Sequence, residues 1–201
     1  MREQYPEDEK KYNWLSILLD TYEIADNVNS QLLKDKEKQE VLIACSKGCS
    51  ACCKNPSVPI TEPELIGISW FASEIISGSI RPILKQQLRR HLSTTCCPFL
   101  VNDNCSIYPV RPLACRQFFV RNVPCKDNED VSHTRPKDII IPSKDGAKQV
   151  GMKLLEYFGY IKSSEKNKAF NSGFIFLKSK QMHDYDWNHI ADTMDYFDQK
   201  T

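Results

Sequence analysis

The sequence has little of what marks membrane, secreted or nucleic-acid-binding proteins. No apolar run approaches the ~20 residues that cross a bilayer, and the first ten residues, MREQYPEDEK, lack the apolar segment of a secretory signal. The 27 basic residues are balanced by 26 acidic ones, and a net charge of +1 gives no field that would attract nucleic acid or anionic lipid. We therefore expect a cytoplasmic protein with no nucleic-acid or membrane partner.

Glycine and histidine are also scarce. Seven glycines leave little material for a dinucleotide-binding loop, and the sequence has no G-x-S-x-G nucleophile elbow. The four histidines show no paired metal spacing such as H-E-x-x-H. Nothing therefore indicates a catalytic residue, and the sequence leaves open whether the protein is an enzyme.

Cysteine, in contrast, is abundant: the chain has nine in 201 residues. One dense block holds Cys45, Cys49, Cys52 and Cys53, and a second holds Cys96, Cys97, Cys105 and Cys115. In a reducing compartment clustered thiols indicate metal binding or catalysis rather than disulfides. The odd number also disfavours a closed disulfide framework.

The spacing of the cysteines favours a thiolate metal site. Two residues separate Cys49 from Cys52, so a tight turn aims both sulfurs at one point. The side chains of the adjacent Cys52 and Cys53 should diverge, and one ion would bind both only with strain. Seven or eight candidate ligands exceed the four of a tetrahedral zinc site. This indicates two metals, a cluster with spare thiols, or one site beside redox-active thiols.

Periodicity predicts a mainly α fold with a small cysteine-rich β-hairpin, its helices packed around a thiolate metal centre. A capping box, Thr61 with Glu64, opens one helix. Helices are expected over 9–38, 61–77, 145–158 and 186–197, and a further helix with Pro82 in its first turn should run to about Leu92. The hairpin should pair 98–101 with 105–108 around a polar turn, placing Cys97 and Cys105 on opposite arms. Residues 55–60 should be extended, and 120–142 should be mostly irregular with one short strand near 139–141.

We expect a single domain over residues 1–201. It would comprise an N-terminal helix within 1–44, a cysteine-rich metal-binding core over 45–125, and a C-terminal helical and aromatic extension over 126–201. The aromatic residues of the last third are expected mainly in the core.

The cysteine blocks resemble a known family. The resemblance rests on CSACC at 49–53, CPFL at 97–100, CSIY at 105–108 and RPLACRQF at 111–118. These segments are similar to the CxxCxxCC family of zinc- or iron-chelating domains, the YkgJ-type proteins. Three residues separate Cys45 from Cys49, where the family pattern has two. The resemblance implies a ligand set of Cys45, Cys49, Cys52, Cys53, Cys97, Cys105 and Cys115; Cys96 lies outside it, and Cys125 is a possible eighth ligand.

Two arginines flank the last cysteine of the second block. Four thiolates around Zn²⁺ or an oxidised 4Fe–4S core carry a net charge of −2, which Arg111 and Arg116 could balance. The leading hypothesis is a protein that holds zinc or iron, with an Fe–S cluster as one form of the iron. The alternatives are an Fe–S-dependent oxidoreductase or protein-modifying enzyme component, and a metal-free thiol redox sensor.

Overall fold

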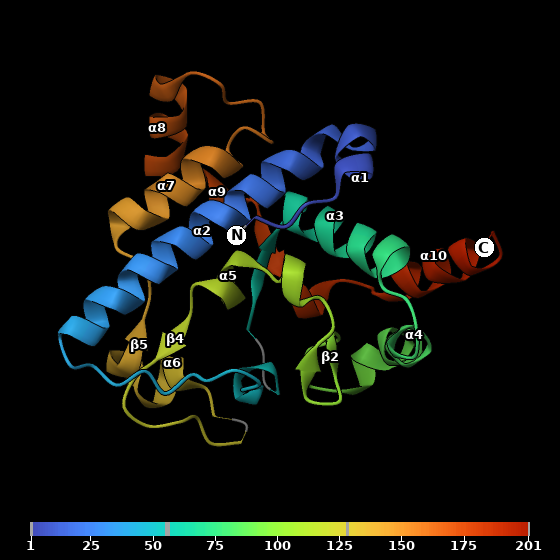
Figure 1. Cartoon of the computed structure of the whole chain (residues 1–201), viewed down its shortest axis with the longest axis horizontal. Coiled ribbons are helices and arrows are strands. Elements are labelled where there is room, and N and C mark those ends of the chain that lie inside the picture. The colour runs from blue at the N-terminus through green and yellow to red at the C-terminus, as the bar shows by residue number, and fades with distance from the viewer. Residues whose placement is uncertain (1, 55–56, 128, 201) are drawn as a thin grey trace.

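The computed structural model describes residues 2–54, 57–127 and 129–200 (Figure 1). The chain is mainly helical with small antiparallel strand pairs, as predicted. The helices are α1 (Pro6–Lys11), α2 (Asn13–Lys38), α3 (Glu62–Trp70), α4 (Ile80–Arg90), α5 (Leu113–Arg116), α6 (Val131–Thr134), α7 (Lys144–Leu154), α8 (Ser163–Asn171), α9 (Phe174–Leu177) and α10 (Asn188–Asp198). The paired strands are β1 (Pro59–Thr61) with β6 (Ser179–Gln181), β2 (Leu100–Val101) with β3 (Asn104–Cys105), and β4 (Phe119–Val120) with β5 (Ile139–Ile140).

Helix α2 is the longest helix of the described chain, with 26 residues, and α7 lies beside it (Figure 1). Its apolar residues recur at helical spacing, so one face is buried, including Leu15, Leu18 and Leu19. The contact with α7 is close at Gly146, where an added Cβ would lie 2.7 Å from Cγ1 of Val28. A larger side chain there would separate the two helices.

The single helix expected over 9–38 is wrong at its start. Tyr12 is extended (φ −121°, ψ 96°) and divides α1 from α2. Its hydroxyl donates to Glu74 at 2.8 Å. The break also lets Tyr5 pack edge-on against Trp70, with 4.9 Å between ring centroids. Aromatic packing across the fold therefore outweighs the helical periodicity of this segment.

The capping box that opens α3 is confirmed, because the Thr61 side chain and the Glu64 carboxylate each bind the other's backbone N–H. The helix then ends in a π-helical turn, Phe71–Ile75. Helix α4 begins at Ile80, which places Pro82 in its first turn as expected, and a 3₁₀ turn over His91–Ser93 follows it. Because the α-helix stops at Arg90, Leu92 is 73% exposed rather than continuing the buried face of Leu84 and Leu88.

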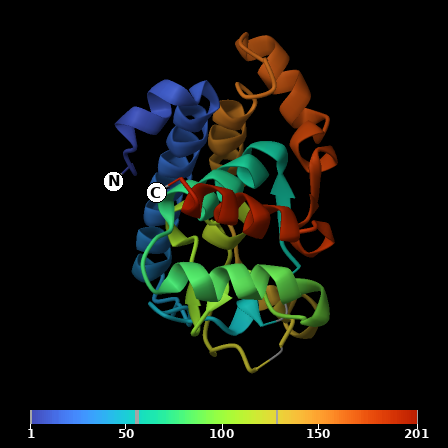
Figure 2. The ribbon, with the colours of Figure 1, turned by 90° about the vertical axis from the view of Figure 1, so that its right-hand side faces the viewer.

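Helix α10 was predicted and packs on α4 (Figure 2). The pairing of β1 with β6 was not predicted, and it returns the C-terminal third to the start of α3. Helices α8 and α9 were also missed. Helix α8 buries only Ala169 among its residues, so its sequence carries almost no apolar periodicity.

Three further expectations need correction. The hairpin exists but is only two residues long on each arm, with Asn102 and Asp103 at positive φ in its turn. The segment 120–142 is more regular than expected, because it contains α6, a 3₁₀ turn and β5. The helix expected over 145–158 ends at Leu154. Of the extended segment 55–60, residues 55–56 lie outside the described residues and 59–60 belong to β1.

The aromatic C-terminal third only partly enters the core. Trp187 is 1% exposed, whereas Phe176 and Tyr196 are largely exposed. Within the described chain, no helix combines the length and apolar character that a membrane span requires.

Candidate metal centre

Three cysteine-bearing segments contribute side chains to one cavity. The first is a 3₁₀ turn, Ala51–Cys53, the second is the loop that leads into β2, and the third is α5. The backbone N–H of Cys97 donates to the carbonyl of Cys53 at 2.7 Å, which joins the two cysteine blocks directly. Gln87 on α4 fixes the second segment by donating to the carbonyls of Pro98 (2.9 Å) and Leu100 (2.7 Å).

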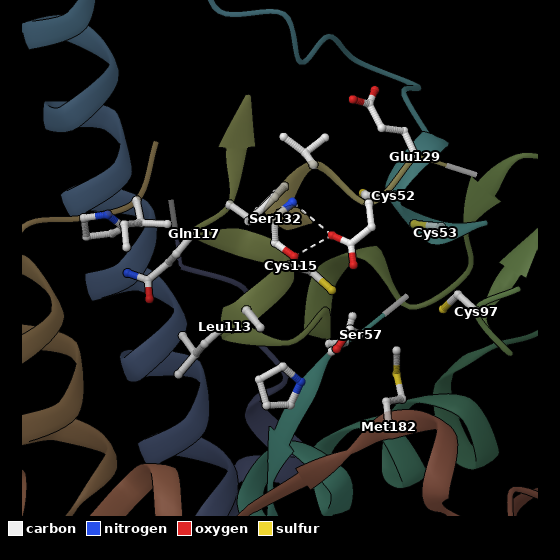
Figure 3. A pocket seen from close by; sticks show the side chains of 18 of the residues that line it. Cys52, Cys53, Ser57, Cys97, Leu113, Cys115, Gln117, Glu129, Ser132 and Met182 are labelled. Atoms are coloured by element: carbon white, nitrogen blue, oxygen red, sulfur yellow. Dashed lines mark hydrogen bonds between the residues drawn. The ribbon is translucent and has the colours of Figure 1, made fainter. Parts of the chain in front are cut away.

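These segments surround a cavity of about 500 Å³ (Figure 3). Cys52, Cys53, Cys97 and Cys115 all line it. Most of the remaining wall is apolar and comes from Val58, Pro59, Leu113, Ala114, Phe118, Val131, Ile141, Pro142, Ala147 and Met182. The cavity therefore joins a group of thiols to an apolar chamber.

Helix α5 is held by polar groups from two other helices. The backbone N–H of Leu113 donates to Glu64 at 2.7 Å, and the Asn29 amide on α2 donates to the carbonyl of Arg116 at 3.0 Å. Both anchors are buried side chains. Cys115 lies between the two anchored positions, so its sulfur is positioned by α2 and α3 together.

Backbone N–H groups point at three of the sulfurs. Val120 donates to Cys45 Sγ at 3.3 Å. The N–H groups of Phe99 and Leu100 stabilise the thiolate form of Cys97, and that of Ile107 does so for Cys105. Hydrogen bonds of this kind favour charged sulfur and tune metal-bound thiolates.

Burial opposes this effect. Loss of solvent raises the pKa of Cys97 to about 12 and is the main cause of the raised pKa of Cys105 and Cys115. Mutual repulsion between thiolates raises the pKa of Cys115 further. These sulfurs are therefore neutral at pH 7 without a cation, and a bound cation would displace their protons.

The thiols of the adjacent Cys52 and Cys53 influence each other's ionisation. Cys52 is exposed, whereas Cys53 packs against the apolar core. The interaction with Cys53, with help from the positive charge of Arg111, lowers the pKa of Cys52 to about 7. The interaction with Cys52 is the main cause of the raised pKa of Cys53. Cys52 therefore ionises more readily than its neighbour.

The two arginines occupy distinct environments. Arg116 is buried, and its Nη1 contacts both carboxylate oxygens of Asp26, at 3.0 and 2.9 Å. Arg111 lies over the Tyr108 ring, 4.1 Å from its centroid, and its buried Nε has no hydrogen-bond partner within the described residues. Both guanidinium groups lower the pKa of Cys105. Their positive charge therefore reaches the sulfurs.

The remaining cysteines lie outside the cavity wall. Cys49 is exposed, and Cys45, Cys96, Cys105 and Cys125 are half-buried. Within residues 2–54, 57–127 and 129–200, no three histidine, cysteine, aspartate or glutamate side chains are already placed to hold a metal ion. The sulfurs are gathered, but they have not closed into a coordination shell.

Residues 44–137 match the family model CxxCxxCC, described as "Putative zinc- or iron-chelating domain". The resemblance noted from the sequence is thus confirmed for this part of the chain. The matched CxxCxxCC region contains every candidate ligand from Cys45 to Cys125. No curated protein and no solved structure matches the chain.

The donor set of the CxxCxxCC region fits such a metal. Thiolates are the preferred ligands of zinc and of Fe–S clusters. Buried thiols with backbone N–H donors and nearby guanidinium groups supply the ligands and part of the charge balance. The residue types of this region are therefore those that zinc or iron would need.

The sequence did not reveal that Asp26 and Asn29 hold α5 in place. It also did not reveal that Glu64, expected only as part of a capping box, binds the backbone of α5. The capping box revealed Glu64, but its bond to Leu113 joins residues 49 apart in sequence. Asp26 and Asn29 lie on a long helix where polar residues ordinarily face solvent. No local pattern signals these long-range contacts.

Proposed function

We propose that this protein holds zinc or iron through cysteine thiolates, with Cys53, Cys97, Cys105 and Cys115 as the principal ligands. The observation that carries the proposal is the set of backbone N–H groups directed at sulfurs in the family-matched region. Such donors offset negative charge on sulfur, which a neutral buried thiol would not need. Cys97 and its neighbours Cys53 and Cys105 also pack against the apolar core, so their positions are constrained.

The ion would supply a positive charge that stabilises the thiolates and closes the loop between the two cysteine blocks. Four thiolates around a divalent ion leave a net charge of −2, which we assign Arg111 and Arg116 to offset. Arg111 is suited to this role because its Nε has no partner in the described structure. Arg116 acts from a fixed position, since Asp26 and two backbone carbonyls hold its guanidinium.

The cavity favours a second candidate function, an Fe–S-dependent oxidoreductase or protein-modifying enzyme component. A chamber of about 500 Å³ is large enough for a small organic molecule or a protein side chain. Its wall brings such a ligand beside Cys97 and Cys115. The buried Gln117 Nε2, without a partner among the described residues, offers one polar contact to orient it.

Metal analysis of protein purified without oxygen tests these proposals. Stoichiometric zinc and no colour would favour a structural or storage role. Stoichiometric iron and sulfide with a brown chromophore would favour the Fe–S enzyme. Metal-free protein with freely reactive thiols, prepared under conditions that retain metal in a known zinc protein, would refute both and leave a thiol redox sensor.

A pair of neighbouring substitutions tests the ligand assignment. Cys97→Ser should abolish metal at the principal site, because Cys97 is buried and receives two N–H donors. Cys96→Ser is the matched control, since Cys96 lies outside the cavity wall. Equal metal content in Cys97→Ser and wild-type protein would contradict the assignment.

A further inference from the structure

A second cavity, of about 310 Å³, is distinct from the cysteine cavity and shares none of its lining residues. One part of its wall is a face of α2, on which Glu23, Asp26 and Asn29 follow each other at intervals of three. Arg111, just after the 3₁₀ turn Tyr108–Val110, forms another part. No cysteine of the described chain lines this cavity, so thiolate chelation does not account for it.

Arg111 brings unused hydrogen-bond donors to this second cavity. Its guanidinium lies 4.1 Å from the centroid of the Tyr108 ring, and its N–H groups have no hydrogen-bond or ion-pair partner among the described residues. The two other arginines of the wall, Arg2 and Arg116, are both held in ion pairs. Arg116 also donates to the backbone carbonyl of Arg111, at 3.2 Å, and so holds the segment that carries it. A guanidinium with free donors on a fixed segment is suited to bind a carboxylate or a phosphate.

Asn29 brings an unused acceptor to the same cavity. The side chain is only 6% exposed, and its Nδ2 donates to the carbonyl of Arg116 at 3.0 Å. This bond fixes the orientation of the amide, and it leaves Oδ1 without a partner in the part of the chain that the structure describes. Buried side-chain oxygens without a partner are rare in folded proteins. A ligand that matches this cavity therefore carries a hydrogen-bond donor as well as an anionic group.

The remaining wall narrows the class of ligand further. Glu3 and Glu23 line the cavity, and neither forms an ion pair among the described residues, so their charge opposes a phosphate and favours an ammonium group. The apolar surface comes from Leu19, Leu33, Phe119 and the rings of Tyr22 and Tyr108. A volume of about 310 Å³ is near the lower end for ligand pockets, so the ligand is small.

We propose that this cavity binds a free α-amino acid with an apolar side chain, whose carboxylate lies on Arg111 and whose ammonium group lies between Asn29 Oδ1 and Glu23. Such a zwitterion supplies both partners that the cavity lacks, and its side chain covers the apolar wall. The proposal goes beyond metal binding and does not depend on it. Arg111 keeps the charge role proposed above, because its charge acts on the thiols through space and leaves its N–H groups available.

Isothermal titration calorimetry of the full-length protein, with its metal as purified, tests the proposal with L-leucine, L-methionine and L-phenylalanine. At least one of them should bind with a stoichiometry of one per chain. Matched probes each lack one group: L-leucinamide has no carboxylate, 4-methylpentanoate has no ammonium group, and inorganic phosphate has neither the ammonium nor the apolar part. Each should bind about tenfold more weakly or not at all, since a hydrogen bond to a charged group is lost.

The outcomes with these probes decide the class of ligand. No heat from any of the three amino acids would overturn the proposal, and water would then satisfy Asn29 Oδ1 and Arg111. Phosphate or 4-methylpentanoate binding as tightly as the amino acids would also overturn it, in favour of a simple anion site.

Two substitutions test the residue assignment. Glu23→Gln and Arg111→Lys should each weaken amino-acid binding about tenfold. Glu23 forms no hydrogen bond through its carboxylate in the described structure, so its replacement should leave the fold intact, and Arg111→Lys keeps the positive charge. Glu37→Gln makes the same change at the exposed end of α2 and should bind as wild type does. Unchanged affinity in both Glu23→Gln and Arg111→Lys would overturn the site. Metal content measured on the same samples should be equal in all of them, so a failure of metal binding is recognised separately.

Discussion

The helices and the first cysteine segment are stabilised in opposite ways. The helical body, comprising α2, α3, α4, α7 and α10, is held by fully buried apolar side chains such as Leu15, Ile68, Leu84 and Met194. In the first cysteine segment, residues 41–54, every side chain is half-buried or exposed. This segment carries four cysteines and is attached by backbone hydrogen bonds and the Lys54–Asp127 ion pair.

The magnitudes explain what this difference means. A buried aliphatic side chain contributes about 1.5–3 kcal/mol, whereas a typical hydrogen bond contributes about 0.5–1.5 kcal/mol and an exposed ion pair about 0–1 kcal/mol. The helical body therefore folds by its own burial. Residues 41–54 have too little buried surface to offset the entropy of ordering the chain, and we expect a metal ion to supply the difference.

Metal removal should have the largest effect on stability, and it should disorder residues 41–54 while leaving the helical body folded. With a chelator under reducing conditions, amide exchange in residues 41–54 should become nearly unprotected, because their order depends on thiolate–metal bonds. Amides of α2 and α4 should stay protected. Hydrogen exchange with mass spectrometry measures both regions in one experiment.

The thermal midpoint checks the same prediction. A loss of several kcal/mol corresponds to a fall of roughly 10 °C for a chain of this size. Restoring Zn²⁺ or Fe²⁺ should reverse the change. Unchanged protection of residues 41–54 in protein verified as metal-free would show that the segment is ordered without an ion. The proposed difference between this segment and the helical body would then be wrong.

Phe99→Ala should have the next largest effect, because it removes a buried ring that packs the second cysteine segment into the apolar core. Phe99 is fully buried beside the cysteine blocks and packs edge-on against Trp187, with 4.8 Å between centroids. Truncating a buried phenylalanine costs about 3–5 kcal/mol. Denaturant unfolding of metal-loaded protein measures it, with Leu92→Ala as the exposed control. A loss below about 1 kcal/mol would mean that the Phe99 ring does not hold the second cysteine segment in the apolar core.

Elements that rest on local sequence patterns were predicted, whereas elements that depend on tertiary contacts were not. The apolar face of α2, the capping box of α3 and helix α10 were found, because each rests on a local pattern. The pairing of β1 with β6 joins residues more than a hundred positions apart, and no local signal encodes it. The break at Tyr12 was missed because its cause, the packing of Tyr5 on Trp70, is a tertiary contact.

The candidate site follows the same rule. Of the seven cysteines that the family resemblance implied as ligands, Cys52, Cys53, Cys97 and Cys115 line one cavity, whereas Cys45, Cys49 and Cys105 do not. Spacing did not reveal the 3₁₀ turn that carries Cys52 and Cys53, nor the mutual effect of the two thiols on their ionisation. The role of Glu64 in holding α5 arises only after the chain has folded.

Asp26→Asn should lower the free energy of unfolding moderately, and it tests whether the helical body positions the cysteine-bearing α5. Asp26 lies on the helical body, but its carboxylate holds Arg116 of the cysteine-bearing α5. Replacing it should cost about 1–2 kcal/mol, because Arg116 is buried while Asp26 is 40% exposed and partly screened. Asp35→Asn, on the exposed end of α2, is the control. Equal unfolding free energies for both variants would show that α2 does not position α5 through this pair.

The smallest expected effect is a pH dependence confined to the cysteine-bearing region. A hydrogen bond from Arg135, with others from the Lys126 N–H and Thr134, lowers the pKa of Glu129 from 4.5 to about 2. A carboxylate with a lowered pKa stabilises the fold above pH 4.5, and this contribution is lost as the pH falls toward 2. Glu129→Gln should therefore speed amide exchange over residues 129–138 at pH 6, and the difference from wild type should shrink below pH 4. Thiol protonation affects both proteins alike, and the exposed Glu7→Gln controls for general charge effects. A difference that grew on acidification would mean that Arg135 does not stabilise the ionised Glu129.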